Sequence, residues 1–151
     1  MTFQGIPLHP LIVHFAIVFL LVVAGAQVLA VLLPRFRAWI GWALPVAGVI
    51  TAVVAKLTTT TGDDLSDTRN TPAVERHEDW GERLELLGFT LAAVAVVYWL
   101  VTSPWGRAKL GDRLPSWVAP VVGVIAALIG VATIVVTTIT GHTGAASVWS
   151  G

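Results

Sequence analysis

The chain has 151 residues, of which 56% are hydrophobic and only 12% carry a charge. A soluble domain is about 45–50% apolar and about 25% charged, so this chain has too little polar surface to coat a water-facing globule. Its formal net charge is zero, which gives no reason to expect a nucleic-acid partner. It has no cysteine, which excludes disulfides and cysteine-based metal sites. The composition therefore predicts a membrane protein.

Four apolar segments account for this composition, at about residues 11–33, 39–60, 84–103 and 117–140, and the third helix is expected to span 72–103. Each contains close to the roughly 20 residues that cross the hydrocarbon core of a bilayer. Strands of this apolarity would be interrupted about every 4–8 residues, and these segments are not. The third is expected to begin before the membrane, because Pro72 suits the first position of a helix. We expect a single all-α domain over residues 1–151, with four transmembrane helices.

Basic residues are concentrated in two of the three connections. The connections between the first and second and between the third and fourth segments carry Arg35, Arg37, Arg107, Lys109 and Arg113. The connection between the second and third segments is rich in acidic residues. Because short cytoplasmic loops are enriched in Lys and Arg, we predict that both termini lie outside the cytoplasm.

One face of the third segment carries four carboxylates at helical spacing, and we expect it to face water or a partner: Glu75, Glu78, Glu82 and Glu85. The opposite face contains Gly81 and Gly88. It is expected to pack inside the bundle, because glycine lets another helix approach closely. Lys56, near the end of the second segment, is expected to reach outward to the interface or to pair with Asp63 or Asp64.

Two of the segments share a sequence pattern. The stretches Trp42–Ile50 and Trp117–Ile125 are identical at six of nine positions, and both segments end in threonines followed by glycine. This similarity predicts two pseudo-repeated helical hairpins of the same orientation, related by an axis along the membrane normal. The alternative is chance similarity between two spans rich in valine and glycine.

Four spans bring the four histidines to one end of the bundle. His9 and His14 lie at the start of the first helix, His77 near the start of the third, and His142 directly after the fourth. The repeat places Asp63 where the other hairpin has His142. We therefore predict a metal site whose imidazole and carboxylate ligands suit zinc, iron or copper, formed by His14, Asp63, His77 and His142. Two facing imidazoles would instead suit a six-coordinate haem.

The helical rise of about 1.5 Å per residue places His9, His77 and His142 near one height and His14 deeper. Each histidine also has an ordinary explanation, since an interfacial imidazole can bond a loop carbonyl or a carboxylate. As cofactor ligands we rank His14 and His77 first, His142 next and His9 last. His9 precedes Pro10, where extended backbone is expected.

Short motifs resemble those of a known family. They are the string Pro-Leu-His-Pro-Leu-Ile-Val-His-Phe at Pro7–Phe15, then Thr61-Gly62-Asp63, His77-Glu78 with Gly81, and Thr140–Gly144. Over nearly its whole length the chain resembles the DUF2231 family of predicted bacterial membrane proteins, with Thr143 where an apolar residue is expected. The resemblance implies a four-helix domain in the bacterial cytoplasmic (inner) membrane. Some members look fused to Rieske-type domains, which implies a redox setting, but no reaction is assigned.

These observations lead us to expect a membrane protein with a histidine-lined centre at its outer face, used in electron transfer. The cofactor would be haem b or a transition metal (Fe, Cu or Zn). The expected partners are the lipid bilayer and either a membrane redox protein or a second copy of the chain. The alternative is a non-catalytic membrane subunit or interaction module whose histidines are structural.

Overall fold

The computed structural model describes residues 2–3, 6–66, 72–110 and 113–149. Two strands of two residues, β1 (Thr2–Phe3) and β2 (Ile6–Pro7), pair antiparallel at the start of the chain. Within the described residues, six helices follow: α1 (Leu8–Leu32), α2 (Pro34–Ile40), α3 (Ala43–Ser66), α4 (Pro72–Thr102), α5 (Pro104–Leu110) and α6 (Val118–Trp149). The predicted helical fold is confirmed.

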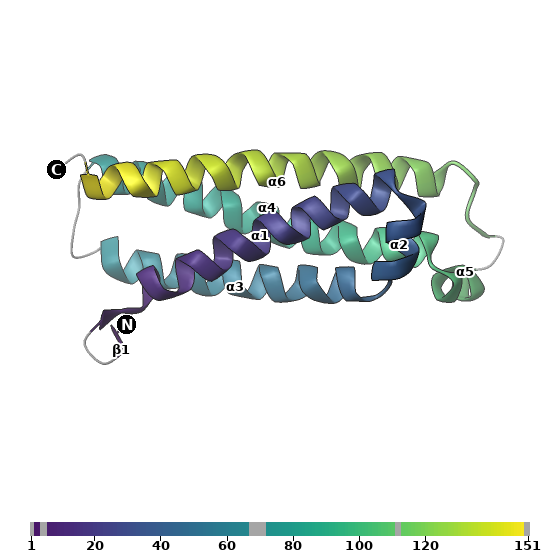
Figure 1. Ribbon diagram of the computed structural model, residues 1–151, viewed down its shortest axis with the longest axis horizontal. Coiled ribbons are helices and arrows are strands. Elements are labelled where there is room, and N and C mark those ends of the chain that lie inside the picture. The colour runs from purple at the N-terminus through teal and green to yellow at the C-terminus, as the bar shows by residue number, and fades with distance from the viewer. Residues whose placement is uncertain (1, 4–5, 67–71, 111–112, 150–151) are drawn as a thin grey trace.

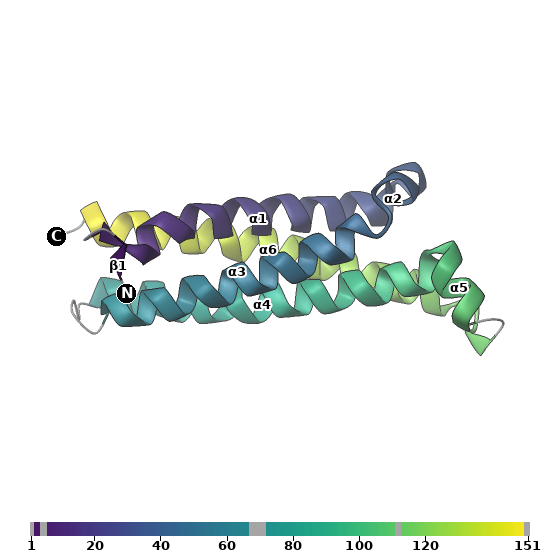
Figure 2. The same ribbon diagram turned by 90° about the horizontal axis from the view of Figure 1, so that it is seen from below.

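Four of the helices are long and apolar enough to cross a membrane. The apolar stretches are Ile12–Leu32, Ala43–Gly62, Glu75–Thr102 and Val118–Thr143. The four helices lie lengthwise beside one another (Figures 1 and 2). The starts of α1 and α4 and the ends of α3 and α6 lie together at one end, which we call the terminal end. The short helices α2 and α5 lie at the opposite end, which we call the linker end.

Several boundaries differ from the expected ones. α1 begins at Leu8, so His9 lies in helical backbone and not in extended backbone. Pro10 then falls in the first turn, where its missing N–H has no carbonyl to bond. α6 continues to Trp149 and does not end near Thr140. Both loops of the linker end contain a helix that begins at a proline, a residue suited to the first helical position.

The four long helices form a square bundle in which α1 and α4 are diagonal. α3 and α6 each pack against both α1 and α4. The core contains small residues such as Ala24, Ala95 and Ala126. Large apolar side chains point outward, with exposed fractions of 62–69% at Val22, Leu128, Phe15, Leu32 and Leu86. This distribution suits a membrane bundle, because lipid solvates the outer side chains while small residues let the helices approach.

Glycines mark the close approaches between helices. A Cβ added at Gly48 of α3 would lie 3.2 Å from the Cα of Ala92 on α4. One added at Gly123 of α6 would lie 3.3 Å from a ring carbon of Tyr98 on α4 and 3.7 Å from Val31 on α1.

The square arrangement, with α1 and α4 diagonal, is the one that a twofold axis exchanging the two hairpins would require. The superposition of the two hairpins stays a prediction.

Candidate functional site

Contacts between α4 and α6 place His77 and His142 at the same level of the terminal end. Nδ1 of His77 lies 3.4 Å from the Oγ1 of Thr143, the residue after His142. One turn further in, the Thr140 hydroxyl donates to the carbonyl oxygen of Trp80, at 3.4 Å. The two helices therefore run in register here. The expectation that His77 and His142 share one height agrees with these contacts.

His14 lies near the same height and not deeper. A Cβ added at Gly141 of α6 would lie 4.0 Å from Cδ1 of Ile17 on α1. His14 precedes Ile17 by about one helical turn, which places it level with the residues just after His142 in the antiparallel α6. The prediction that His14 lies deeper was wrong because it assumed that the two hairpins turn at the same height along the bundle. α5 and the start of α6 extend beyond α2 (Figures 1 and 2), so the first hairpin turns closer to the terminal end.

The side chains of His14 and His142 are exposed, whereas His77 is half-buried. The side chains of His9 and Asp63 lie outside the described part of the chain. Among the side chains that the structure describes, no three His, Asp or Glu residues group closely enough to hold a metal ion. The four-ligand site and the pairing of two imidazoles on a haem therefore both stay predictions.

One contact at the terminal end resembles the usual surroundings of a metal-binding histidine. Histidine ligands of metals usually bond a polar group through their second ring nitrogen, which fixes the orientation of the imidazole. The Thr143 hydroxyl stands in that position beside Nδ1 of His77.

The bundle is closely packed further from the terminal end. A Cβ added at Gly88 would already meet Ala55 at 3.4 Å and Leu20 at 3.7 Å. The prediction that Gly88 faces the interior is confirmed.

An ion pair joins α3 to α4. Nζ of Lys56 lies 3.0 Å from Oε1 of Glu85, with exposed side-chain fractions of 57% and 20%. The Thr59 hydroxyl also bonds Glu85. Glu85 was not among the partners expected for Lys56, and the side chains of Asp63 and Asp64 lie outside the described part of the chain. Glu85 therefore faces α3, whereas Glu75 and Glu82 are exposed.

The interior of the bundle is unusually polar for a membrane span. Threonines of α3 and α6 are buried, and most donate to the carbonyl four residues earlier, as Thr137 does to Thr133 at 2.6 Å. Gln27 of α1 is fully buried, and its side-chain amide has no hydrogen-bond partner within the described part of the chain. Threonines satisfied by their own helix cost little to bury, whereas an unbonded amide is costly.

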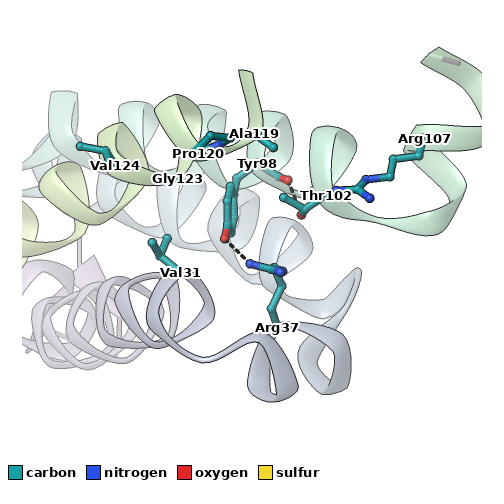
Figure 3. Close-up of a pocket in the computed structure, with 9 residues that line it drawn as sticks. All are labelled: Val31, Arg37, Tyr98, Thr102, Arg107, Ala119, Pro120, Gly123 and Val124. Carbon is teal, nitrogen blue, oxygen red and sulfur yellow. Dashed lines mark hydrogen bonds between the residues drawn. The ribbon is translucent and has the colours of Figure 1, made fainter. Parts of the chain in front are cut away.

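A pocket of about 380 Å³ opens at the linker end, between α1, α2, α4, α5 and α6 (Figure 3). Nη1 of Arg37 donates to the hydroxyl of Tyr98 at 2.7 Å, and its guanidinium carbon lies 5.7 Å from the centre of the Tyr98 ring. Tyr98 is 3% exposed, and its hydroxyl lies 3.4 Å from the carbonyl oxygen of Ala30. Arg107 lines the pocket from α5, beside Thr102.

A second pocket of about 510 Å³ adjoins the first and shares Arg37 and Tyr98 with it. Three tryptophans line it, Trp42, Trp99 and Trp105, and the last two are stacked with ring centres 5.4 Å apart. In the sequence the arginines indicated only the orientation of the chain, because the pockets depend on the two short helices of the loops. One signal was present. Tyr98 is the chain's only tyrosine, and it lies within an apolar span where its hydroxyl needs a partner.

The chain belongs to the DUF2231 family. The family model, described as a predicted membrane protein, matches residues 5–151. No curated protein and no solved structure matches the chain. The family match and the four apolar helices together establish a multi-pass membrane protein.

Proposed function

We propose that the terminal end binds haem b or a transition-metal ion and that the protein transfers electrons at the membrane surface. The observation that carries this proposal is that three of the four histidines come from α1, α4 and α6 to one height of the bundle. Imidazole is a preferred ligand of haem iron, copper and zinc. A bound haem, iron or copper would supply one-electron chemistry, which zinc cannot.

The three histidines have different roles in this proposal. His77 is half-buried and held beside the Thr143 hydroxyl, so its ring is the best oriented before a cofactor binds. His142 is exposed, so its side chain can change rotamer toward a ligand without disturbing the core, and His14 is exposed as well. His9 and Asp63 complete the set of proposed ligands. The site lies on the surface of the terminal end because the bundle below it is closely packed.

The test is the absorption spectrum and metal content of the full-length protein, purified from cells supplied with a haem precursor, iron, copper and zinc. We expect either an oxidised and reduced haem spectrum or a stoichiometric metal. His14→Ala and His77→Ala should lower cofactor content most, His142→Ala less and His9→Ala least. Thr138→Val is the matched control, because this exposed threonine bonds only its own helix, at the Ile134 carbonyl.

Two outcomes reject the redox proposal. One is wild-type protein without haem or metal after growth in replete medium. The other is full occupancy in all four histidine variants. The contact of His77 with Thr143 then favours the second candidate, a non-catalytic membrane subunit in which this histidine joins α4 to α6. In that case His77→Ala and Thr143→Val should lower the unfolding temperature by similar amounts, with no change in bound metal or haem.

We further propose that the chain lies in the bacterial inner membrane with both termini, and hence the terminal end, outside the cytoplasm. The basis is the group of five Lys and Arg residues in the loops of the linker end. A C-terminal alkaline phosphatase fusion should be active, and a C-terminal green fluorescent protein fusion should be dark. The reverse result would place the histidines on the cytoplasmic side.

A further inference from the structure

The linker end has a strong excess of positive charge. Residues 1–62 contain no Asp or Glu, and residues 86–151 contain one, Asp112, which lies outside the described residues. The same end carries five basic residues in its two loops. The chain as a whole is neutral, so this excess is a local feature that the acidic connection at the other end balances. A partner of the linker end would therefore be anionic.

Two of these cations line one pocket from different helices. Arg37 comes from α2 and Arg107 from α5, and both border the same space (Figure 3). Within the described part of the chain, neither forms an ion pair with a carboxylate. A guanidinium group has five N–H donors, and the Tyr98 hydroxyl accepts one from Arg37. The buried tyrosine thus fixes the direction of Arg37 and leaves further donors for an anion.

The neighbouring pocket offers the complementary apolar surface. Its tryptophans, Trp42, Trp99 and Trp105, lie at the end of the bundle, where aromatic side chains meet the headgroup region of a bilayer. Because this pocket shares Arg37 with the first, a ligand that fills both must have an anionic group joined to an apolar body. A phospholipid with a net negative charge has both parts.

We propose that the linker end binds the phosphate of an anionic phospholipid between Arg37 and Arg107, with the acyl chains leaving past the tryptophans. Arginine binds phosphate oxygens through paired N–H groups, and basic pockets between transmembrane helices are typical sites for anionic headgroups. Tyr98 is a positioning residue, since it acts through Arg37. This proposal is independent of any cofactor at the terminal end.

The experiment measures binding of phosphatidylglycerol to the full-length protein in a neutral detergent, by native mass spectrometry over a lipid titration. Phosphatidylcholine is the lipid control and inorganic phosphate the competitor. Arg37→Gln and Arg107→Gln should each weaken phosphatidylglycerol binding about fivefold, the usual effect of one basic residue at a membrane surface. Arg35→Gln is the matched control, because this exposed arginine of α2 lines neither pocket and should bind as the wild type does.

Tyr98→Phe separates positioning from charge. It keeps every charge and the ring but removes the hydroxyl that holds Arg37, so it should weaken binding of phosphatidylglycerol and leave phosphatidylcholine unaffected. If Arg37→Gln does not fold, Arg107→Gln decides the question alone, because this side chain is exposed.

Three results would overturn the proposal. An equal loss of affinity in Arg35→Gln would indicate diffuse attraction to the whole basic end. Equal affinity for phosphatidylcholine would show that no anionic headgroup is selected. Displacement of phosphatidylglycerol by inorganic phosphate at equal concentration would assign the pocket to free phosphate and not to a lipid.

Discussion

Gly130 of α6 lies against α1 with no room for a methyl group. A Cβ at this position would lie 2.8 Å from Cγ2 of Val28 and 3.0 Å from the carbonyl oxygen of Ala24. The carbonyl belongs to the helix backbone and cannot turn away. Valine in a helix has one strongly preferred rotamer, so Val28 cannot turn away cheaply either. Gly130→Ala must therefore push α6 away from α1.

The size of this effect follows from two opposing terms. Alanine is favoured over glycine inside a helix by about 1 kcal/mol, whereas overfilling a packed contact costs about 1–3 kcal/mol. Gly25→Ala in α1 should show only the gain in helix stability from replacing glycine, because a Cβ added there meets no atom within 4 Å. Gly130→Ala should therefore be about 1–3 kcal/mol less stable than Gly25→Ala.

The assay is unfolding of the detergent-solubilised protein with increasing dodecyl sulfate, followed by circular dichroism. We expect the midpoint of Gly25→Ala to lie at or above that of the wild type. The midpoint of Gly130→Ala should lie below that of the wild type. Equal midpoints for the two variants would refute the close approach of α1 and α6 at Gly130.

Three further substitutions test other contacts. Gly88→Leu should lower stability by about 1–3 kcal/mol by overfilling, whereas Gly88→Ala, with no contact closer than 3.4 Å, should be tolerated; equal thermal midpoints would argue that this face is not packed. Lys56→Met removes the ion-pair partner of Glu85 and should lower the free energy of unfolding by about 1 kcal/mol. Most of this loss should be recovered when Glu85→Gln is added. A double-mutant cycle without coupling would contradict the ion pair. Gln27→Leu removes a buried amide without a partner among the described residues, so it should raise stability by about 1–2 kcal/mol; a loss in calorimetry would indicate that the amide bonds a buried water.

Much of the fold was predictable from local sequence. The lengths of the four apolar runs determine the number of spans, because a bilayer requires about 20 apolar residues per helix. An even number of spans brings both termini, and with them His14, His77 and His142, to one end. Pro72 begins α4 as expected, and Gly88 lies inside the bundle because a residue without a side chain permits close helix contact.

The terminal end shows why the candidate site was only partly predictable. Counting residues along separate helices gave the right level for His77 and His142 but the wrong one for His14. The level of a residue depends on where its hairpin turns and on how its helix is tilted, and both are set by contacts between helices. The partner of Lys56 was missed for a related reason. Glu85 comes from another helix, and its rotation toward α3 depends on how the two helices pack.

The linker end depends almost wholly on tertiary structure. Arg37, Tyr98 and Arg107 are separated along the chain, and they line one pocket because α2 and α5 fold back over the ends of the long helices. By itself the sequence determined a membrane domain of four helices with its histidines and most of its charged residues near the ends. Hydrophobic length and helical spacing are local properties, which explains why they could be read from the chain. Only the tertiary structure decided which helices are neighbours, at what heights they meet and which side chains share a pocket, because these depend on the packing of side chains far apart in the sequence.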